Sequence, residues 1–348
     1  MQAYYIIGLM SGTSLDGIDL CYAQFYNNGT ESYALLHGKT IEYTSEFQKQ
    51  LRKANQCSAL ELMQLDADLG IFFGEQIKLF IKENNIQQID AIASHGHTIF
   101  HSPQHHLSTQ IGSPAQIYAI TGIKTIADFR SIDVALGGQG APLVPIGDQQ
   151  LFSNYSSCLN LGGIANISFD QQQKRIAYDI CMCNMALNYL ALKLGHSYDK
   201  NGNIASSGQI NLKLLEDLNQ FHYFSSEPPK SLGREQFDDW YLPLLENSSI
   251  SVPDMMATTV EHIGMQIGKN IPKGNCLLTG GGVFNTSLIN ALKKHTQSTL
   301  EIPNNNLIEY KEALVFAYLG MLRLTNRKNT LSSVTGARRD SIGGCLYG

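Results

Sequence analysis

Three glycine-rich segments with polar neighbours contain the residues best suited to bind a phosphate group. They are Ser11-Gly12-Thr13-Ser14-Leu15-Asp16-Gly17-Ile18, then Gly162-Gly163 with Asn166, and Gly280-Gly281-Gly282 with Asn285. Glycine has no Cβ, so backbone N–H groups in such loops can approach phosphate oxygens. Each segment alone also fits an ordinary tight turn. The motif G-x-x-x-x-G-K-[ST] does not occur, so a nucleotide would be bound without a P-loop.

Carboxylates lie next to two of these segments. Asp16 and Asp19 lie in and just after the first one, and they could hold Mg²⁺ through water, although Asp16 is also a common turn residue. Asp179 follows a predicted strand at 175–178, beyond the second segment. There it could act as a general base beside a transferred phosphoryl group, or it could cap a helix over 182–194.

Histidines and one arginine form a second polar group. His95, His97 and His101 have the spacing H-x-H-x₃-H, which would suit zinc, but Gly96 and the lack of a nearby acidic partner favour residues lining a polar pocket. Arg130 could grip a carboxylate through two parallel hydrogen bonds, or form a surface ion pair with Asp128 or Asp133.

The elements that must position these residues follow from hydrophobic patterning. Strands at 4–9 and 18–25 form a hairpin around the first glycine segment, and strands at 157–161 and 164–169 form another around the second. The repeated hairpin indicates two similar half-molecules. A long amphipathic helix is predicted over 59–84. Short strands at 89–94 and 124–128 each lead into the polar residues described above.

The order of hairpin, hairpin and strand-GGG-helix is typical of the actin-like ATPase fold. This α/β architecture has two lobes and a central active-site cleft, in which two hairpins grip the phosphates and the third loop holds adenosine. Gly137-Gly138-Gln139-Gly140-Ala141-Pro142 is the clearest break in composition. We therefore expect an N-terminal lobe at 1–136 and a C-terminal lobe at 137–348, whose tail could pack back on the first lobe.

Composition excludes several classes of protein. The chain has 348 residues, 43% hydrophobic and 16% charged, with a net charge of -5, so it has no broad attraction for nucleic acid or anionic lipid. No apolar run approaches the roughly 18 to 20 residues that span a membrane, and no basic leader precedes the first strand, so we expect a cytoplasmic protein. Seven irregularly spaced cysteines predict reduced thiols, and Cys181-Met182-Cys183 is only a weak metal signal.

The segment from Gly8 to Asp19, GLMSGTSLDGID, is similar to the opening signature of the anhydro-N-acetylmuramic acid kinases. The same family's order of motifs continues along nearly the whole chain, through SHGHTI at 94–99, QIG at 110–112, ADFR at 127–130, GGQGAPLVP at 137–145, NLGGIAN at 160–166, PKS at 229–231, GRE at 233–235 and TGGGVFN at 279–285.

The resemblance implies a cytoplasmic, generally homodimeric sugar kinase of murein (peptidoglycan) recycling. Such an enzyme converts 1,6-anhydro-N-acetylmuramic acid, ATP and water into N-acetylmuramate 6-phosphate and ADP, with Mg²⁺. Asp179 matches the family's catalytic base, which would take a proton from the water that attacks C1 while O6 accepts the γ-phosphoryl group. The first glycine segment matches the phosphate loop. His97, Thr98, Arg130 and Glu312 match the sugar pocket, where Arg130 would bind the lactyl carboxylate.

One departure from the family lies directly after Asp179. Many members have D-[TC]-G-P-G-N, whereas this chain has Asp179-Ile180-Cys181-Met182-Cys183-Asn184. Where such glycines adopt positive φ, a cysteine would cost about 1 kcal/mol or more. The departure fits an enzyme with a rebuilt turn, which we favour, or a non-catalytic sugar- or nucleotide-binding protein on the same fold. The order of the motifs disfavours a hexokinase-like enzyme that acts on a free hydroxyl.

Overall fold

The protein forms two compact units, one of residues 1–151 and 310–348 and the other of residues 152–309. The computed structural model describes residues 2–12, 15–27 and 31–348. The first unit extends beyond the glycine-rich segment at 137–142 where we expected the boundary, because α5 (Pro145–Leu151) packs in this unit. A Cβ on Gly147 of α5 would lie 2.6 Å from Val315 Cγ2. The C-terminal residues also belong to the first unit.

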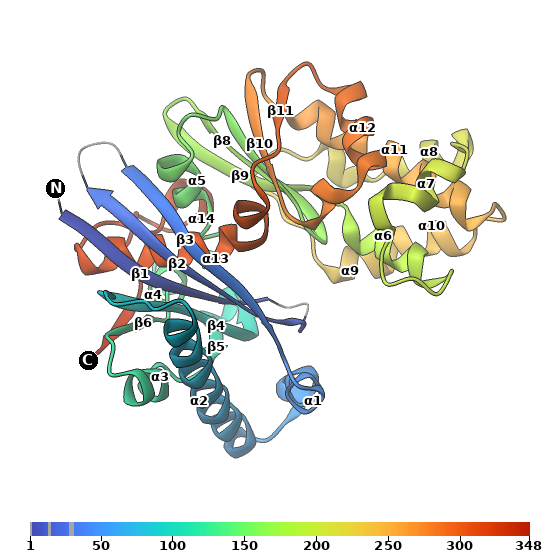
Figure 1. Cartoon of the computed structure of the whole chain (residues 1–348). Helices are drawn as coiled ribbons and strands as arrows, with labels where there is room; N and C mark the ends of the chain where they lie inside the picture. Colours follow the sequence, from blue (N-terminus) through green and yellow to red (C-terminus); the bar gives the residue numbers. More distant parts are fainter. Residues whose placement is uncertain (1, 13–14, 28–30) are drawn as a thin grey trace. The chain divides into compact units, whose positions relative to one another are not determined.

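The first unit is built on a seven-stranded sheet of order β12-β6-β4-β1-β2-β3, with β5 paired to β4 (Figure 1). Its strands are β1 (Gln2–Ser11), β2 (Gly17–Asn27), β3 (Glu31–Glu42), β4 (Ala91–Ser102), β5 (Leu107–Ile111), β6 (Thr125–Ala127) and β12 (Cys345–Tyr347). β1, β2 and β3 form an antiparallel meander, and β4 and β6 continue the sheet in parallel with β1. The C-terminal strand β12 pairs antiparallel with β6.

Alternation along β1 explains how helices cover both faces of this sheet. Ile7 and Leu9 are fully buried in a cluster with residues of α2 (Ala59–Glu83) and α3 (Pro114–Thr121). Gly8 points to the other face, because successive strand residues face opposite sides. There α13 (Asn305–Leu324) approaches so closely that a Cβ on Gly8 would lie 1.9 Å from the carbonyl oxygen of Ala313. The remaining helices of this unit are α1 (Ser45–Lys53), α4 (Ser131–Ala135) and α14 (Ser332–Thr335).

The second unit contains a five-stranded sheet of order β11-β10-β7-β8-β9. Its strands are β7 (Ser157–Leu161), β8 (Ile164–Gln171), β9 (Lys174–Met182), β10 (Asn275–Thr279) and β11 (Thr299–Glu301). β7, β8 and β9 form an antiparallel meander, and β10 and β11 extend the sheet in parallel with β7. Its helices are α6 (Asn184–Leu192), α7 (Asn203–Ser207), α8 (Leu212–Asn219), α9 (Arg234–Gln236), α10 (Leu242–Glu246), α11 (Val252–Asn270) and α12 (Thr286–His295).

The two sheets share one topology, an antiparallel three-stranded meander followed by two parallel strands. This repeat confirms the two similar halves predicted from the glycine hairpins, and it confirms the α/β class expected for an actin-like ATPase fold. The shared order also places the two hairpin turns, between β1 and β2 and between β7 and β8, at equivalent positions of their sheets.

Two predicted strand ends are wrong. β4 continues through Ser102, so 94–98 is strand rather than loop, because β5 pairs with this stretch at His97↔Ile111 and Thr98↔Gln110. Gly96 has φ of +72°, the left-handed conformation that suits glycine, within this irregular part of the strand. β9 likewise continues to Met182, because its last residues pair with β8. Asp179 therefore lies inside a strand.

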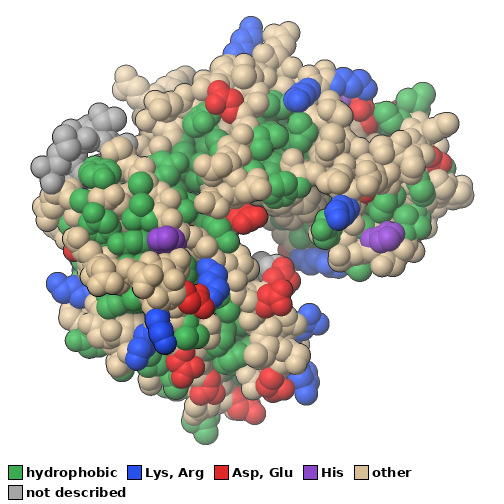
Figure 2. All heavy atoms as spheres, viewed as in Figure 1, with side chains coloured by type: hydrophobic (Ala, Val, Ile, Leu, Met, Phe, Trp, Pro, Cys, Tyr) green, Lys and Arg blue, Asp and Glu red, His purple; other side chains and the backbone are tan. Residues whose placement is uncertain are grey.

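The surface agrees with the charge balance of the sequence. On the face shown in Figure 2, lysine and arginine side chains of the described residues are scattered among acidic and apolar ones. Among the helices of residues 2–12, 15–27 and 31–348, none has both the length and the hydropathy needed to cross a membrane.

Candidate active site

In the first unit, three side chains form a buried hydrogen-bonded chain beside the first glycine segment. Ser11 Oγ lies 2.8 Å from His97 Nδ1 and 2.6 Å from the hydroxyl of Tyr43. The contact arises because Ser11 at the end of β1 pairs with His97 on β4. Burial lowers the pKa of His97 to about 4, so its imidazole is neutral at physiological pH. The structure therefore brings together a predicted phosphate-loop residue and a predicted sugar-pocket residue.

Arg130 is held by neutral acceptors. Its Nε and Nη2 lie 3.0 and 2.8 Å from His95 Nε2, and its Nη1 donates to the carbonyl of Gly140 at 2.6 Å. His95 Nδ1 lies 2.9 Å from the carbonyl of Gly96, which can only accept, so Nδ1 carries the proton and Nε2 has the lone pair. Burial, and then the charge of Arg130, hold the pKa of His95 well below its usual range.

The surface ion pairs considered for Arg130 do not form. Asp133 is fully buried and accepts from the backbone N–H of Gly140 and the hydroxyl of Thr335. Asp128 accepts from the backbone N–H of Ser131. Arg130 thus keeps a positive charge that no carboxylate of the described residues contacts within ion-pair distance. An anionic ligand would satisfy it.

Glu312 on α13 completes this group of charges. Burial lowers the pKa of Arg130 to about 10, and the nearby carboxylates of Glu312 and Asp133 oppose that shift. Burial raises the pKa of Glu312, and Asp19 adds to the rise, while Lys311 and Arg130 act against it. Glu312 still reaches solvent. Glu312 therefore lies close enough to both Arg130 and Asp19 to interact electrostatically with each of them.

Other predicted residues of the first unit have structural partners. Thr98 accepts from the side-chain amide of Gln110 at 3.3 Å, and contacts none of the other predicted sugar-pocket residues by hydrogen bond.

Gly17 lies against β3, where a Cβ would be 2.1 Å from the carbonyl oxygen of Ile41, so close strand packing alone requires glycine there. Leu15 has φ of 62°, and Ile18 is fully buried. Gly12 is half-buried, and Thr13 and Ser14 lie outside the described residues.

The acidic residues near the first hairpin suit a hydrated cation. Asp16 is exposed and its carbonyl accepts from the backbone N–H of Tyr43, whereas the carboxylate of Asp19 accepts from the Thr40 hydroxyl at 2.6 Å. The described residues contain no cluster of three His, Cys, Asp or Glu side chains able to enclose a metal. Mg²⁺ needs no such enclosure, because it keeps several waters and binds through one or two carboxylates and substrate phosphates.

In the second unit, Asp179 lies on β9 and accepts hydrogen bonds from two groups of one segment, residues 223–232. Its Oδ2 accepts from the backbone N–H of Leu232 at 2.9 Å, and its carbonyl accepts from the Tyr223 hydroxyl at 2.7 Å. Burial raises the pKa of its carboxyl, and the Leu232 N–H partly offsets the rise. The alternative role as helix cap is wrong, because α6 begins at Asn184 and Cys183 occupies its N-cap position.

The second glycine turn caps α6 through its backbone. The carbonyl of Gly162 accepts from Asn184 N–H, and that of Gly163 accepts from the N–H groups of Cys183 and Met185. Asn184 also donates from its side chain to the carbonyl of Leu161 at 2.9 Å. Asn166 pairs in register with Asp179 across β8 and β9. Hydrogen bonds and strand pairing therefore connect the turn, the start of α6 and the predicted base directly to one another.

A hollow of about 470 Å³ adjoins the third glycine segment within the second unit. Its lining consists of Asn184, Leu187, Asn188, Tyr198, Asp199, Lys200, Asn201, Gly281, Phe284 and Asn285. Gly280 has φ of +84°, and the Asn285 side chain accepts from Leu288 N–H to cap α12. Tyr198 and Phe284 are 57% and 45% exposed, which leaves aromatic surface for a flat ligand.

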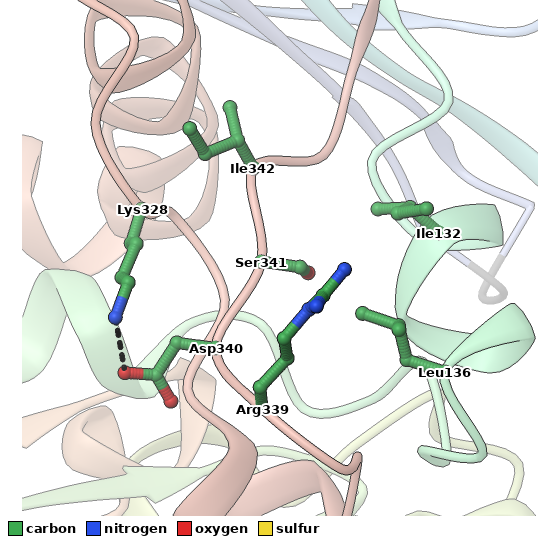
Figure 3. Close-up of a pocket in the computed structure, with 7 residues that line it drawn as sticks. All are labelled: Ile132, Leu136, Lys328, Arg339, Asp340, Ser341 and Ile342. Carbon is green, nitrogen blue, oxygen red and sulfur yellow. Dashed lines mark ion pairs between the residues drawn. The ribbon is translucent and has the colours of Figure 1, made fainter.

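A hollow of about 350 Å³ in the first unit lies apart from the predicted residues (Figure 3). Ile132 of α4 and Leu136, the C-terminal cap of this helix, lie opposite Arg339 and Ser341, and Lys328 pairs with Asp340 at 3.7 Å. It contains none of the side chains predicted for the site.

The zinc alternative for the histidines is not supported. His95 contacts Arg130, His97 contacts Ser11, and His101 lies 3.2 Å from the Ser108 hydroxyl, so their ring nitrogens are directed to separate partners. Cys181 and Cys183 are fully buried, and burial raises the pKa of both thiols, that of Cys183 to about 12. Both are therefore protonated core residues.

Several residues of the site were missed by sequence reasoning. The sequence predicts His95 only as a pocket-lining residue. Its contact with Arg130 is not predicted, because the two residues lie 35 positions apart. Tyr43 and Tyr223 carry no local signal, because each reaches the site from a remote segment, whereas Leu232 lies between the motifs at 229–231 and 233–235. Tyr198 and Phe284 had a usable signal, since Phe284 directly follows the third glycine segment.

Comparison with known proteins places this arrangement in a family. A protein of Hydrogenovibrio crunogenus named anhydro-N-acetylmuramic acid kinase is 38% identical over 98% of this chain and 97% of its own length. Proteins of the same name from Saccharophagus degradans and Coxiella burnetii are 34% and 36% identical, covering 100% and 98% of this chain and 100% and 96% of their own. Among solved structures, the (R)-2-hydroxyglutaryl-CoA dehydratase component A of Acidaminococcus fermentans is similar over 90% of this chain and 96% of its own, with 10% identity and a TM-score of 0.46. The model of the family "Anhydro-N-acetylmuramic acid kinase" matches residues 4–348, and the chain belongs to this family.

Proposed function

We propose that this protein phosphorylates 1,6-anhydro-N-acetylmuramic acid with ATP and opens its anhydro ring with water. The products would be N-acetylmuramate 6-phosphate and ADP, in the recycling of peptidoglycan. The observation that carries the proposal is the family match over residues 4–348, which includes every segment assigned to the site.

Asp179 is proposed as the catalytic base. A base must be deprotonated when it acts but still basic enough to accept a proton, and burial raises the pKa of this carboxyl toward that condition. In the proposed reaction Asp179 takes a proton from the water that attacks C1. The C1–O6 bond breaks, and O6 forms a bond to the γ-phosphorus as ADP leaves.

Arg130 is proposed to bind the lactyl carboxylate of the sugar. The side chain is fixed by His95 and Gly140 and has no carboxylate partner among the described residues, so its remaining N–H groups suit an anionic ligand. His97 and Glu312 would contact sugar hydroxyls in the same unit. Thr98 remains a weaker candidate, because its hydroxyl already accepts from Gln110.

ATP is proposed to bind through the three glycine segments. Ser11 to Ile18 and Gly162, Gly163 and Asn166 would face phosphates, while the hollow beside Gly281 and Asn285 would take the adenosine. Mg²⁺ would be held by Asp19 and Asp16 through water, where it neutralises phosphate charge when bound. A cytoplasmic homodimer is proposed from the family resemblance alone.

The unusual sequence after the base supports an active enzyme with a rebuilt turn. Residues 180–183 have negative φ throughout, so no position in this stretch requires glycine. Cys181, Met182 and Cys183 are buried in the core of the second unit instead of forming an open loop. The strand that carries Asp179 thus continues into the helix without backbone strain from positive φ.

The test is ADP release with Mg-ATP and the anhydro-sugar, run in ¹⁸O-water and quenched before the anomeric hydroxyl exchanges. We expect ADP, with one label at C1 and none in the phosphoryl group, because O6 comes from the sugar. Label in the phosphate would mean that water attacks phosphorus. A product with the anhydro bridge intact would mean that another hydroxyl was phosphorylated. Saturable sugar binding without ADP release would favour the non-catalytic alternative.

A further inference from the structure

One segment of the second unit, residues 223–232, contacts Asp179 through three hydrogen bonds. We call it the clamp, and we propose that it positions Asp179 so that Oδ1 is the oxygen that accepts the proton, with Tyr223 as the main positioning residue. The inference rests on the proposed role of Asp179 as base. Neither the family match nor the sequence motifs assign this role to Tyr223.

Three backbone or side-chain groups of the clamp contact one residue. The Tyr223 hydroxyl donates to the carbonyl of Asp179 at 2.7 Å, the N–H of Leu232 donates to Oδ2 at 2.9 Å, and the N–H of Asp179 donates to the carbonyl of Lys230 at 3.4 Å. The main chain on both sides of Asp179 and one carboxylate oxygen are therefore tied to the clamp. Oδ1 has no hydrogen-bond donor among the described residues.

Contacts within the clamp and with neighbouring aromatic residues hold it in place. Lys230 Nζ donates to the carbonyl of Tyr223 at 3.2 Å, and its ammonium lies 4.8 Å from the Tyr223 ring and 5.6 Å from the Tyr178 ring. Phe221 stacks on Trp240 at 4.1 Å and on Tyr223 at 5.9 Å. Tyr223 is only 8% exposed, so its hydroxyl has little freedom to leave Asp179.

The target of the Tyr223 hydroxyl matters for the chemistry. A donor to the carboxylate would stabilise its charge and make it a weaker base. The hydroxyl instead donates to the main-chain carbonyl, so it fixes the position of Asp179 without stabilising the charge of the carboxylate through a hydrogen bond. Accurate placement of a base contributes to rate because the reacting atoms are already aligned when substrate binds.

Tyr223→Phe tests the proposal, and Tyr178→Phe is its matched control. Tyr178 is adjacent to Asp179 and also lies under Lys230, but its hydroxyl donates to Asn270 at 3.1 Å. Tyr223→Phe should lower kcat about 10-fold, which is part of the roughly 10²- to 10⁴-fold that a positioned base supplies. KM for both substrates should stay within about twofold, because the change does not touch binding groups. Tyr178→Phe should keep kcat within about twofold.

Two further measurements separate positioning from general loss of structure. In an Asp179→Asn background, Tyr223→Phe should cause no additional loss, because Tyr223 acts only through the carboxylate. A ¹³C NMR titration of the Asp179 carboxyl should show a lower pKa in Tyr223→Phe, because a loosened clamp admits water, and no change in Tyr178→Phe. Among the described residues, the Cys181 thiol and the Tyr223 hydroxyl interact electrostatically with Asp179, and the Lys230 ammonium packs against the rings of Tyr178 and Tyr223.

The outcomes are distinct. Wild-type kcat in Tyr223→Phe, equal losses in both tyrosine variants, or additive loss with Asp179→Asn would each overturn the positioning role. If the wild-type protein releases no ADP, the proposed function fails, and the NMR titration still decides whether the clamp controls the carboxyl. An unchanged carboxyl pKa in Tyr223→Phe would then overturn the inference.

Discussion

At the scale of single residues, the Arg130 guanidinium is fixed in position without an ion-pair partner among the described residues, so it can bind an anionic ligand. Its guanidinium is fixed by a neutral histidine and a backbone carbonyl, and the nearby carboxylates of Asp128 and Asp133 have other partners. Such a cation can form new charge-assisted hydrogen bonds when an anion binds, and these contribute about 1.5 to 3 kcal/mol to the free energy of binding.

Arg130→Ala should therefore raise the Kd of the sugar by roughly 10- to 100-fold, which corresponds to those energies. The Kd of ATP should change by less than about twofold, since no carboxylate is involved. Calorimetric titration with each ligand measures both. Arg339→Ala is the control, because this arginine is exposed and lies at the separate hollow. Equal weakening of both ligands in Arg130→Ala would count against a carboxylate-binding role.

Asp179 is the second single residue considered, and its substitution tests directly whether it is the catalytic base. Asp179→Asn keeps the shape of the side chain and removes its basicity, so kcat should fall by a factor of about 10² or more. ATP should still bind. In the wild-type enzyme, a plot of kcat against pH should fall on the acidic side with a midpoint above the usual aspartate pKa of about 3.9. Because the pKa of the Asp179 carboxyl is raised in the folded protein, the carboxylate is protonated at a higher pH. An Asn variant with a tenth of wild-type turnover would remove Asp179 from this role.

At the scale of elements, the junction of β9 and α6 differs from the family pattern in the residues that follow Asp179, and these residues pack in the core. Cys181 and Cys183 are fully buried, and the three N–H groups at the start of α6 are satisfied by the carbonyls of the glycine turn. Hydrogen bonds that use the backbone do not depend on which side chains follow Asp179. The junction can therefore keep its geometry although the residues differ from the family pattern.

Replacing both cysteines with alanine should leave turnover within a few fold. Unfolding should become easier by about 1 kcal/mol for each cysteine, because each loses a buried sulfur of roughly methylene size. Urea unfolding of the second unit and steady-state turnover give the two measurements. A requirement for zinc or for reductant in the wild-type protein would contradict the structural role of these thiols.

At the scale of the whole molecule, each unit contains histidines that are buried in the neutral form. Burial lowers the pKa of His97 in the first unit to about 4 and that of His262 in the second to about 3. His262 Nδ1 lies 3.0 Å from Asn219 Oδ1, and its Nε2 is buried with no partner among the described residues, so a second proton would find no acceptor.

These shifts predict that stability falls with acidity. The unfolded chain takes up the protons below the ordinary pKa of about 6.5 and the folded chain does not, so the full stability is present above that pH and is lost as pH falls toward the folded-state values. Each such histidine contributes about 1.4 kcal/mol per pH unit at most in this window. Urea midpoints between pH 6.5 and 5 measure the loss. His262→Gln should flatten the dependence for the second unit, and an unchanged slope would contradict the assignment.

Much of this protein could be predicted from local pattern. The glycine turns, the hairpins around them and α2 lie within a few residues of their expected bounds, because strand alternation and helical spacing are carried by neighbouring residues. The order of the motifs also identified the family. Asp179 is predicted as the base because it follows the second hairpin and matches the family's motif.

Tertiary structure alone decided which partners these residues have. Tyr223 and Leu232 reach Asp179 across 44 and 53 positions, Arg130 meets His95 across 35, and Thr335 meets Asp133 across 202. No local periodicity signals such pairs, because they arise when separate strands and loops pack together. The same reason explains the two misplaced strand ends: β4 and β9 continue only because β5 and β8 supply the hydrogen bonds that extend them.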